Sequence, residues 1–123
     1  MNQVAEFTNG RGPDIILEML ANVNLAEDIE IAAPFGRIVV IGSRGAVEIN
    51  PRQAMMKDLR IIGMALPNTP PDDMAAIHVA LGQGLSSGSL NPVIGRELPL
   101  ADAFEAHQAV LRPGAYGKIV LIP

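Results

Sequence analysis

Short apolar runs alternate with amphipathic stretches along the chain, and the two patterns predict different elements. Compact apolar runs bounded by Pro or Gly are typical of buried strands. Five such runs occur: PDIILEML (13–20), RIVVI (37–41), LRIIGMAL (59–66), VIGREL (93–98) and the run that closes the sequence. The stretch before them, MNQVAEFTNGRG, looks like a helix tail closed by Gly10 or Gly12, since glycine commonly follows a helix end.

Helices are expected between the strands. NLAEDIEIAAPFG has apolar residues near helical spacing, and the helix expected there is stopped by Pro34 and Gly36. Pro51 suits the first position of a short helix through Lys57, with Asn50 as its N-cap. Two longer helices are predicted over about 72–85 and 100–111, and VEIN (47–50) is expected to form a short edge piece.

Strands that alternate with helices predict an α/β protein with a largely parallel sheet and right-handed crossovers. Ligands of such sheets bind beyond the carboxyl ends of the strands. The segments expected at those ends are ANVN (21–24), GSRG (42–45) and MAL (64–66). Two glycines, a hydroxyl and a guanidinium in GSRG suit a ligand with phosphate or ribose oxygens, although a plain turn has the same composition.

Composition narrows the classes of function. The 123 residues are 49% hydrophobic but only 3% aromatic, and the formal net charge is −4. Few aromatic platforms and no basic cluster argue against a nucleic-acid partner. The sequence has no cysteine, and His78 and His107 form no spaced pair, so a metal site is not expected. Without a signal peptide or an apolar run of membrane length, a cytoplasmic location is the default.

The motifs EMLANVNL and GSRGAVEINPRQ resemble the zeta-crystallin type of NADPH:quinone oxidoreductase, a group of zinc-independent medium-chain dehydrogenases/reductases. LNPVIGRELPLADAFEAHQAVL and GAYGKIVLIP resemble the C-terminal end of that family. The resemblance implies that the chain is the C-terminal third of such an enzyme, because the family's GroES-like domain and glycine-rich pyrophosphate turn are not in it. The implied fold is the second half of a Rossmann-type parallel sheet with flanking helices (1–88), plus a C-terminal strand–helix–strand segment (89–123) that in the family returns to the catalytic domain.

The resemblance also implies a function and a set of site residues. The parent enzyme would use NADPH to reduce quinones or activated alkenes, and the 123 residues alone would be nearly inactive. Asn24 would contact the ribose region, and the backbone of the third strand end would meet the nicotinamide carboxamide. A homodimer is implied through the edge strand Leu59–Leu66. The implied cofactor contacts are Asn24, Ile41, Gly42, Ser43, Arg44, Met64, Ala65 and Leu66.

Alternatives stay open at the level of sequence. Asn24 also suits a helix cap for LAEDIE. The chain could be a non-catalytic α/β module that dimerises, or a relative of the zinc alcohol dehydrogenases, whose metal ligands lie mostly in a part absent here. NADP and NAD cannot be distinguished, because the residues that read the ribose 2′-position follow the second Rossmann strand, which is not in this sequence.

Overall fold

The computed structural model describes residues 2–114 and 116–123, which form two compact units. One unit runs up to Thr69 and the other begins at Pro70. The sequence-based division at residue 88 refers to the architecture of the family and stays a prediction.

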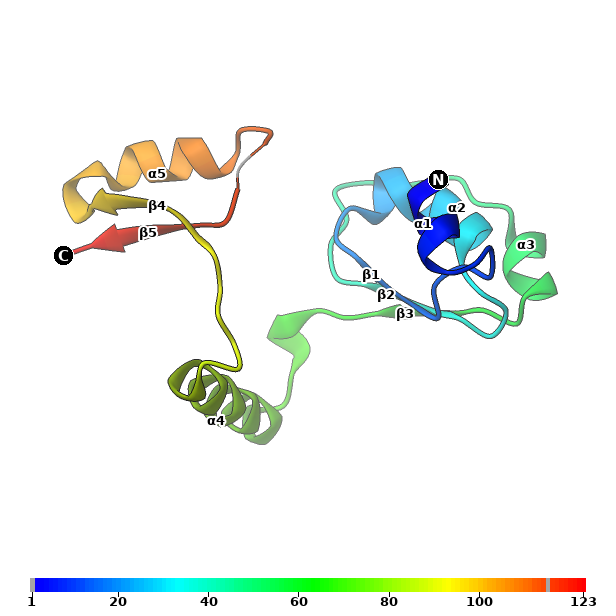
Figure 1. Ribbon diagram of the computed structural model, residues 1–123, viewed down its shortest axis with the longest axis horizontal. Coiled ribbons are helices and arrows are strands. Elements are labelled where there is room, and N and C mark those ends of the chain that lie inside the picture. The colour runs from blue at the N-terminus through cyan, green and yellow to red at the C-terminus, as the bar shows by residue number, and fades with distance from the viewer. Residues whose placement is uncertain (1, 115) are drawn as a thin grey trace. The chain divides into compact units, whose positions relative to one another are not determined.

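The first unit is a parallel three-stranded sheet with helices between its strands (Figure 1). Each strand pairs with the next strand along the chain, in the order β1-β2-β3, which confirms the predicted alternation. The elements are α1 (Asn2–Phe7), β1 (Ile15–Glu18), α2 (Ala21–Ile31), β2 (Arg37–Val40), α3 (Pro51–Met56), β3 (Arg60–Gly63) and the 3-10 helix η1 (Leu66–Asn68).

The register aligns the carboxyl ends of all three strands, because Glu18 pairs with Val40 and Val40 with Gly63. Helix α2 packs on β1 and β2 and also touches α3. Ile29 of α2 and Ile38 of β2 are fully buried, and the alanines at 21, 32 and 33 complete this small core. Burial of these apolar side chains fixes α2 against the sheet next to the carboxyl end of β1.

The start of α3 tests the predicted helix signals. Asn50 caps α3 as expected: its side chain accepts a hydrogen bond from the Arg52 amide at 3.1 Å, and Pro51 follows it. The edge piece expected at 47–50 is wrong, because this segment pairs with no strand in the described part of the chain. Its last residue is instead committed to the α3 cap, and Pro51 has no amide to donate to a ladder.

Lys57 closes the carboxyl end of α2. Its ammonium group donates to three backbone carbonyls, those of Ile29 (3.2 Å), Glu30 (2.5 Å) and Ala32 (3.0 Å). These carbonyls have no partner within the helix, and a cation is favoured at this end of the helix dipole. The side chain thereby joins the segment after α3 to the end of α2.

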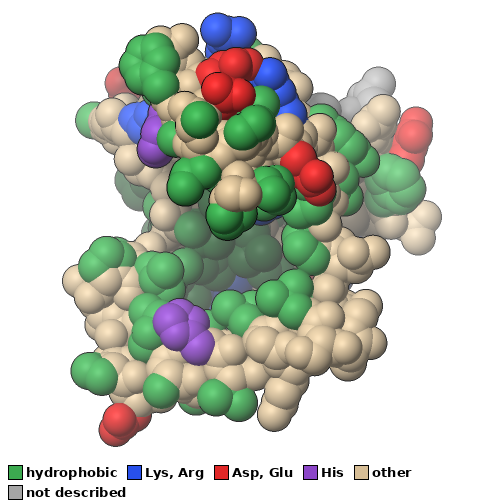
Figure 2. Space-filling model, turned by 90° about the vertical axis from the view of Figure 1, so that its left-hand side faces the viewer, with side chains coloured by type: hydrophobic (Ala, Val, Ile, Leu, Met, Phe, Trp, Pro, Cys, Tyr) green, Lys and Arg blue, Asp and Glu red, His purple; other side chains and the backbone are tan. Residues whose placement is uncertain are grey.

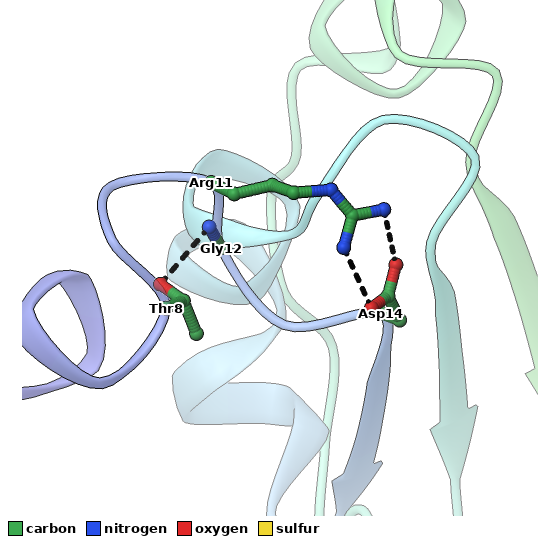
Figure 3. Close-up of polar contacts among 4 residues, drawn as sticks. All are labelled: Thr8, Arg11, Gly12 and Asp14. Carbon is green, nitrogen blue, oxygen red and sulfur yellow. Dashed lines mark hydrogen bonds and ion pairs between the residues drawn. The ribbon is translucent and has the colours of Figure 1, made fainter.

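A tight turn leads from α1 into β1 (Figure 3). The Gly12 amide donates to Thr8 Oγ1 at 3.1 Å, and the Arg11 guanidinium forms two hydrogen bonds to Asp14, at 2.7 and 2.8 Å. Gly12 has a φ of 86°, and a Cβ on it would lie 2.0 Å from the carbonyl oxygen of Ile31. The turn therefore brings the backbone before β1 directly against the end of α2.

The second unit contains a long helix and a parallel strand pair. It consists of α4 (Pro71–Ser87), β4 (Ile94–Pro99), η2 (Leu100–Asp102), α5 (Ala103–Val110) and β5 (Lys118–Ile122). Helix α5 packs on β4 and β5, burying Leu98 and Ala106, and Arg96 pairs with Glu105 at 2.5 Å. Figure 2 shows apolar side chains over much of the face turned toward the viewer, with charged side chains among them. Within the described ranges, no helix is long and apolar enough to cross a membrane.

Candidate functional site

A hollow of ≈ 420 Å³ lies beyond the carboxyl ends of β2 and β3. This is the edge at which open parallel sheets bind ligands. Five of the eight residues expected at a cofactor site line the hollow, and Asn24, Arg44 and Leu66 do not. The lining consists of Val40, Ile41, Gly42, Ser43, Gly63, Met64, Ala65 and Asn68.

Gly42 is where two strand ends come closest. A Cβ built on Gly42 would lie 2.2 Å from the carbonyl oxygen of Met19, so no larger residue fits. Gly45 differs, since a Cβ there would meet no heavy atom within 4 Å. Neither glycine has a positive φ. The close backbone approach that glycine permits is thus found at Gly42 alone, and neither glycine adopts a backbone conformation open only to glycine.

The loop after β2 is fastened to the segment after β1. The Ala21 amide donates to the Gly42 carbonyl at 2.9 Å, and the Gly42 amide donates to the Glu18 carbonyl at 3.2 Å. Asn22 Oδ1 accepts from the Arg44 amide at 2.8 Å. The Ser43 hydroxyl donates to the Gly45 carbonyl at 3.0 Å. Sequence reasoning missed Asn22, although it lies in the ANVN motif, because spacing alone does not tell which amide side chain faces the loop.

Asn24 lies inside α2, so its interpretation as the helix cap is wrong. The helix begins at Ala21, after Leu20, and no side chain makes a cap hydrogen bond there. Instead, a carboxylate oxygen of Glu18 accepts from the Leu20 amide and from Asn24 Nδ2, the latter at 3.2 Å. Asn24 therefore helps to hold the end of β1 against the first turn of α2.

The end of β3 supplies backbone donors. The Met64 amide donates to the Val40 carbonyl at 2.9 Å and is used by the sheet. The amides of Ser43, Ala65 and Leu66 have no hydrogen-bond partner among the described residues. Asn68 follows in η1 and was not anticipated, since nothing in LPN distinguishes it from an ordinary turn residue.

Two buried carboxyl groups lie behind the β1 end of this site. Glu18 is 5% exposed and Asp28 is 7% exposed. Burial and the neighbouring Glu18 carboxylate raise the pKa of Asp28 to about 7. Burial also works to raise the pKa of Glu18, but hydrogen bonds, the strongest of them from the Leu20 amide, outweigh burial and hold this pKa below its ordinary value.

A second hollow, of ≈ 380 Å³, lies at the opposite ends of the strands. Its lining includes Gly12, Pro34 and Lys57, which precede β1, β2 and β3 respectively. Because open α/β sheets bind ligands at the carboxyl ends of their strands, the hollow beside Gly42 is the better candidate site.

The described residues do not offer the donors that a zinc ion needs. The sequence has no cysteine and two histidines, and no three His, Cys, Asp or Glu side chains within 2–114 and 116–123 come together as a possible metal site. His78 on α4 and His107 on α5 are both exposed.

The parallel sheet, the intervening helices and the hollow at the strand ends define a Rossmann-type α/β protein of the dehydrogenase class. The sequence pattern of the family described as zinc-binding dehydrogenase matches residues 2–121. The chain belongs to this family.

Similar proteins agree with this assignment. The quinone oxidoreductase of Homo sapiens is 41% identical over 123 residues, which cover 99% of this chain and 37% of the relative. The crystal structure of an NAD-dependent alcohol dehydrogenase matches with a TM-score of 0.82 at 25% identity, over 99% of this chain and 34% of that one. The CurK enoyl reductase has the same fold, with a TM-score of 0.76 at 21% identity, over 99% of this chain and 38% of that one.

These comparisons confirm the resemblance to quinone oxidoreductases and the predicted fold class. The chain spans little more than a third of the length of the human quinone oxidoreductase that it matches.

Proposed function

We propose that this chain forms the nicotinamide side of the cofactor site of an NADPH-dependent oxidoreductase that reduces quinones or activated alkenes. The observation that carries the proposal is the hollow at the ends of β2 and β3, together with the contact between Gly42 and the Met19 carbonyl. Similarity to the human quinone oxidoreductase supports the substrate class. A cytoplasmic location is part of the same proposal.

The groups around the hollow suit a dinucleotide. The amides of Ala65 and Leu66 can donate to the carboxamide of a nicotinamide ring. Ser43 presents an amide that no described residue uses, and the exposed Arg44 side chain makes no ion pair or hydrogen bond within the described ranges. A guanidinium here can bind phosphate or ribose oxygens. Asn24 Nδ2 already donates to Glu18, which leaves the Asn24 Oδ1 to accept from a ribose hydroxyl.

The bound cofactor would supply the hydride-transfer chemistry, and the protein would supply binding and orientation. Ile41 and Met64 line the hollow on its two strand ends, so they can exclude water from one face of a planar ring. We assign no general acid or nucleophile to the chain, because none of the residues lining the hollow is ionisable.

A chimera tests the proposal. In the human quinone oxidoreductase, the matching 37% of the length is replaced by this chain. We expect the chimera to oxidise NADPH with a quinone, because the three strand ends can complete the site. A folded chimera that binds NADPH without turnover would favour the non-catalytic module.

In this chimera, Arg44→Gln should raise the KM for NADPH about tenfold with little change in kcat, because one charge-assisted contact to the cofactor is lost. Arg52→Gln is the matched control, since Arg52 is an exposed arginine of α3 and lies outside the loop 41–45 that follows β2. Steady-state kinetics with varied NADPH measure both variants. Equal KM values for the two variants would remove Arg44 from the proposed site.

We also propose that two copies pair through the edge strand within Leu59–Leu66. Strand β3 is one edge of the sheet, and its Ile61 and Ile62, which point to opposite faces, are 41% and 43% exposed. An edge strand with unpaired backbone groups and exposed apolar side chains invites pairing with a second copy. Sedimentation should show a dimer that Ile61→Lys converts to a monomer, while Ile15→Lys on the opposite edge strand β1 leaves it intact. The reverse pattern would assign the interface to β1.

A further inference from the structure

The buried carboxyl pair at the end of β1 carries an inference that does not depend on the cofactor. Asp28 Oδ2 is buried and has no hydrogen-bond partner among the described residues. Glu18, its neighbour across the β1–α2 contact, already accepts from the Leu20 amide and from Asn24. Two ionised carboxylates buried together repel each other, and a buried acceptor without a donor is unfavourable. A proton on one of the two carboxyl groups removes the repulsion and supplies the missing donor.

We propose that Glu18 and Asp28 share one proton in the native protein, and that this proton helps to hold the loop 41–45 in place. Asp28 carries the proton and uses it to donate a hydrogen bond to the Glu18 carboxylate. This carboxylate keeps the hydrogen bonds that it accepts from the Leu20 amide and from Asn24. The Glu18 carbonyl in turn accepts from the amides of Ile41 (2.8 Å) and Gly42 (3.2 Å), so the position of this residue sets the start of the loop.

The surroundings agree with a proton held by Asp28. Helix α2 packs on β1, β2 and α3, and the charged groups that act on Asp28 in the described part of the chain are Glu18 and Glu27, both acidic. Two cations on neighbouring elements are engaged or exposed. The Lys57 ammonium donates to the carbonyls of Ile29, Glu30 and Ala32, at the same end of α2 as Asp28, and Arg37 lies exposed at the start of β2. Neither cation is among the groups that shift the pKa of Asp28.

The direction of the pH dependence follows from linkage. The pKa of Asp28 is raised in the folded state, from an ordinary 3.8 to about 7. The native state thus holds a proton that the unfolded chain has lost, and this stabilisation is complete below about pH 4 and is lost as the pH rises through about 7. Glu18, whose pKa is lowered, acts in the opposite sense in acid. Between pH 5 and 8 the Asp28 effect dominates, so the free energy of unfolding falls as the pH rises.

Carbon-detected NMR of the full chain tests the proposal directly. The Asp28 side-chain carboxyl carbon should titrate near pH 7, and the Ile41 and Gly42 amides should exchange faster with solvent above that pH, beyond the ordinary base-catalysed increase seen at reference amides of α3. A carboxyl carbon that titrates near pH 4 would overturn the shared proton. Unchanged protection of both amides across the Asp28 transition would overturn its link to the loop.

Three variants separate this role from simple packing. Asp28→Asn keeps a donor to Glu18 without a titrating group, so its urea midpoint should stay level between pH 5 and 8 while that of the wild type falls. Glu18→Gln supplies a donor to Asp28 and should shift the Asp28 midpoint back toward acid. Glu27→Gln, the control, should leave the Asp28 midpoint within about half a pH unit, because Glu27 is exposed and contributes least to the shift. A wild-type pH dependence that survives Asp28→Asn would refute the proposal.

Discussion

Gly42→Ala should lower the free energy of unfolding of the chain by about 3 kcal/mol, because the added methyl group overpacks a backbone contact. The Cβ would lie 2.2 Å from the Met19 carbonyl oxygen and 3.0 Å from its carbon. These are backbone atoms at the end of β1, so relief requires the two strand ends to separate. In the chimera with the human relative, the same change should abolish NADPH-dependent quinone reduction, because the hollow is displaced. Urea unfolding and steady-state assays measure the two effects.

Gly45→Ala is the matched control for this variant. It changes the second glycine of the same loop, where a Cβ meets no atom within 4 Å and φ is not positive. We expect a change in stability of less than about 0.5 kcal/mol and nearly normal activity. If the two variants behaved alike, the close approach at Gly42 would not be what shapes the site.

Gly12→Ala should destabilise the first unit by about 3–4 kcal/mol, since it combines backbone strain with a clash. Gly12 has a φ of 86°, and its Cβ would lie 2.0 Å from the Ile31 carbonyl oxygen and 3.0 Å from the Ala33 amide nitrogen. The turn shown in Figure 3 would have to move away from the end of α2. Thermal and urea unfolding, followed by circular dichroism, give the free-energy change.

Gly10→Ala isolates the strain from the clash. Gly10 has a φ of 76° but has open space where its Cβ would be. We expect a loss of about 1 kcal/mol, which is the conformational part alone. The difference between the two variants measures the contact with α2. A loss at Gly10 as large as that at Gly12 would contradict the clash.

The order of the elements could be predicted because each strand is a compact apolar run and each helix has its own spacing. Asn50 and Pro51 marked the start of α3 through local chemistry that works in any context. The start of α2 could not be predicted in this way, because no cap residue precedes it. The Glu18 side chain accepts from the Leu20 amide instead, which is visible only when β1 and α2 are adjacent in space.

The residues of the candidate site could also be predicted only in part. The strand-end rule placed GSRG and MAL correctly at one edge of the sheet, and the family motifs named five residues that line the hollow. Asn22 was missed, because its role depends on a contact between segments far apart in sequence, and Asn68 was missed because nothing in LPN distinguishes it from a turn residue. Asn22 meets Arg44 across 22 positions. The Glu18–Asp28 pair was missed for the same reason, since ten positions of sequence separate a strand end from the middle of a helix.

The triple contact made by Lys57 has a chemical consequence. The sequence contains two lysines, and all three ammonium protons of Lys57 are engaged by carbonyls of α2, whereas Lys118 lies exposed on β5. An amine must lose a proton before it can act as a nucleophile, and Lys57 would have to give up a carbonyl to do so. Acylating reagents and acetylating enzymes therefore meet Lys118 as the accessible lysine, and Lys57 becomes open to them only when the end of α2 unwinds.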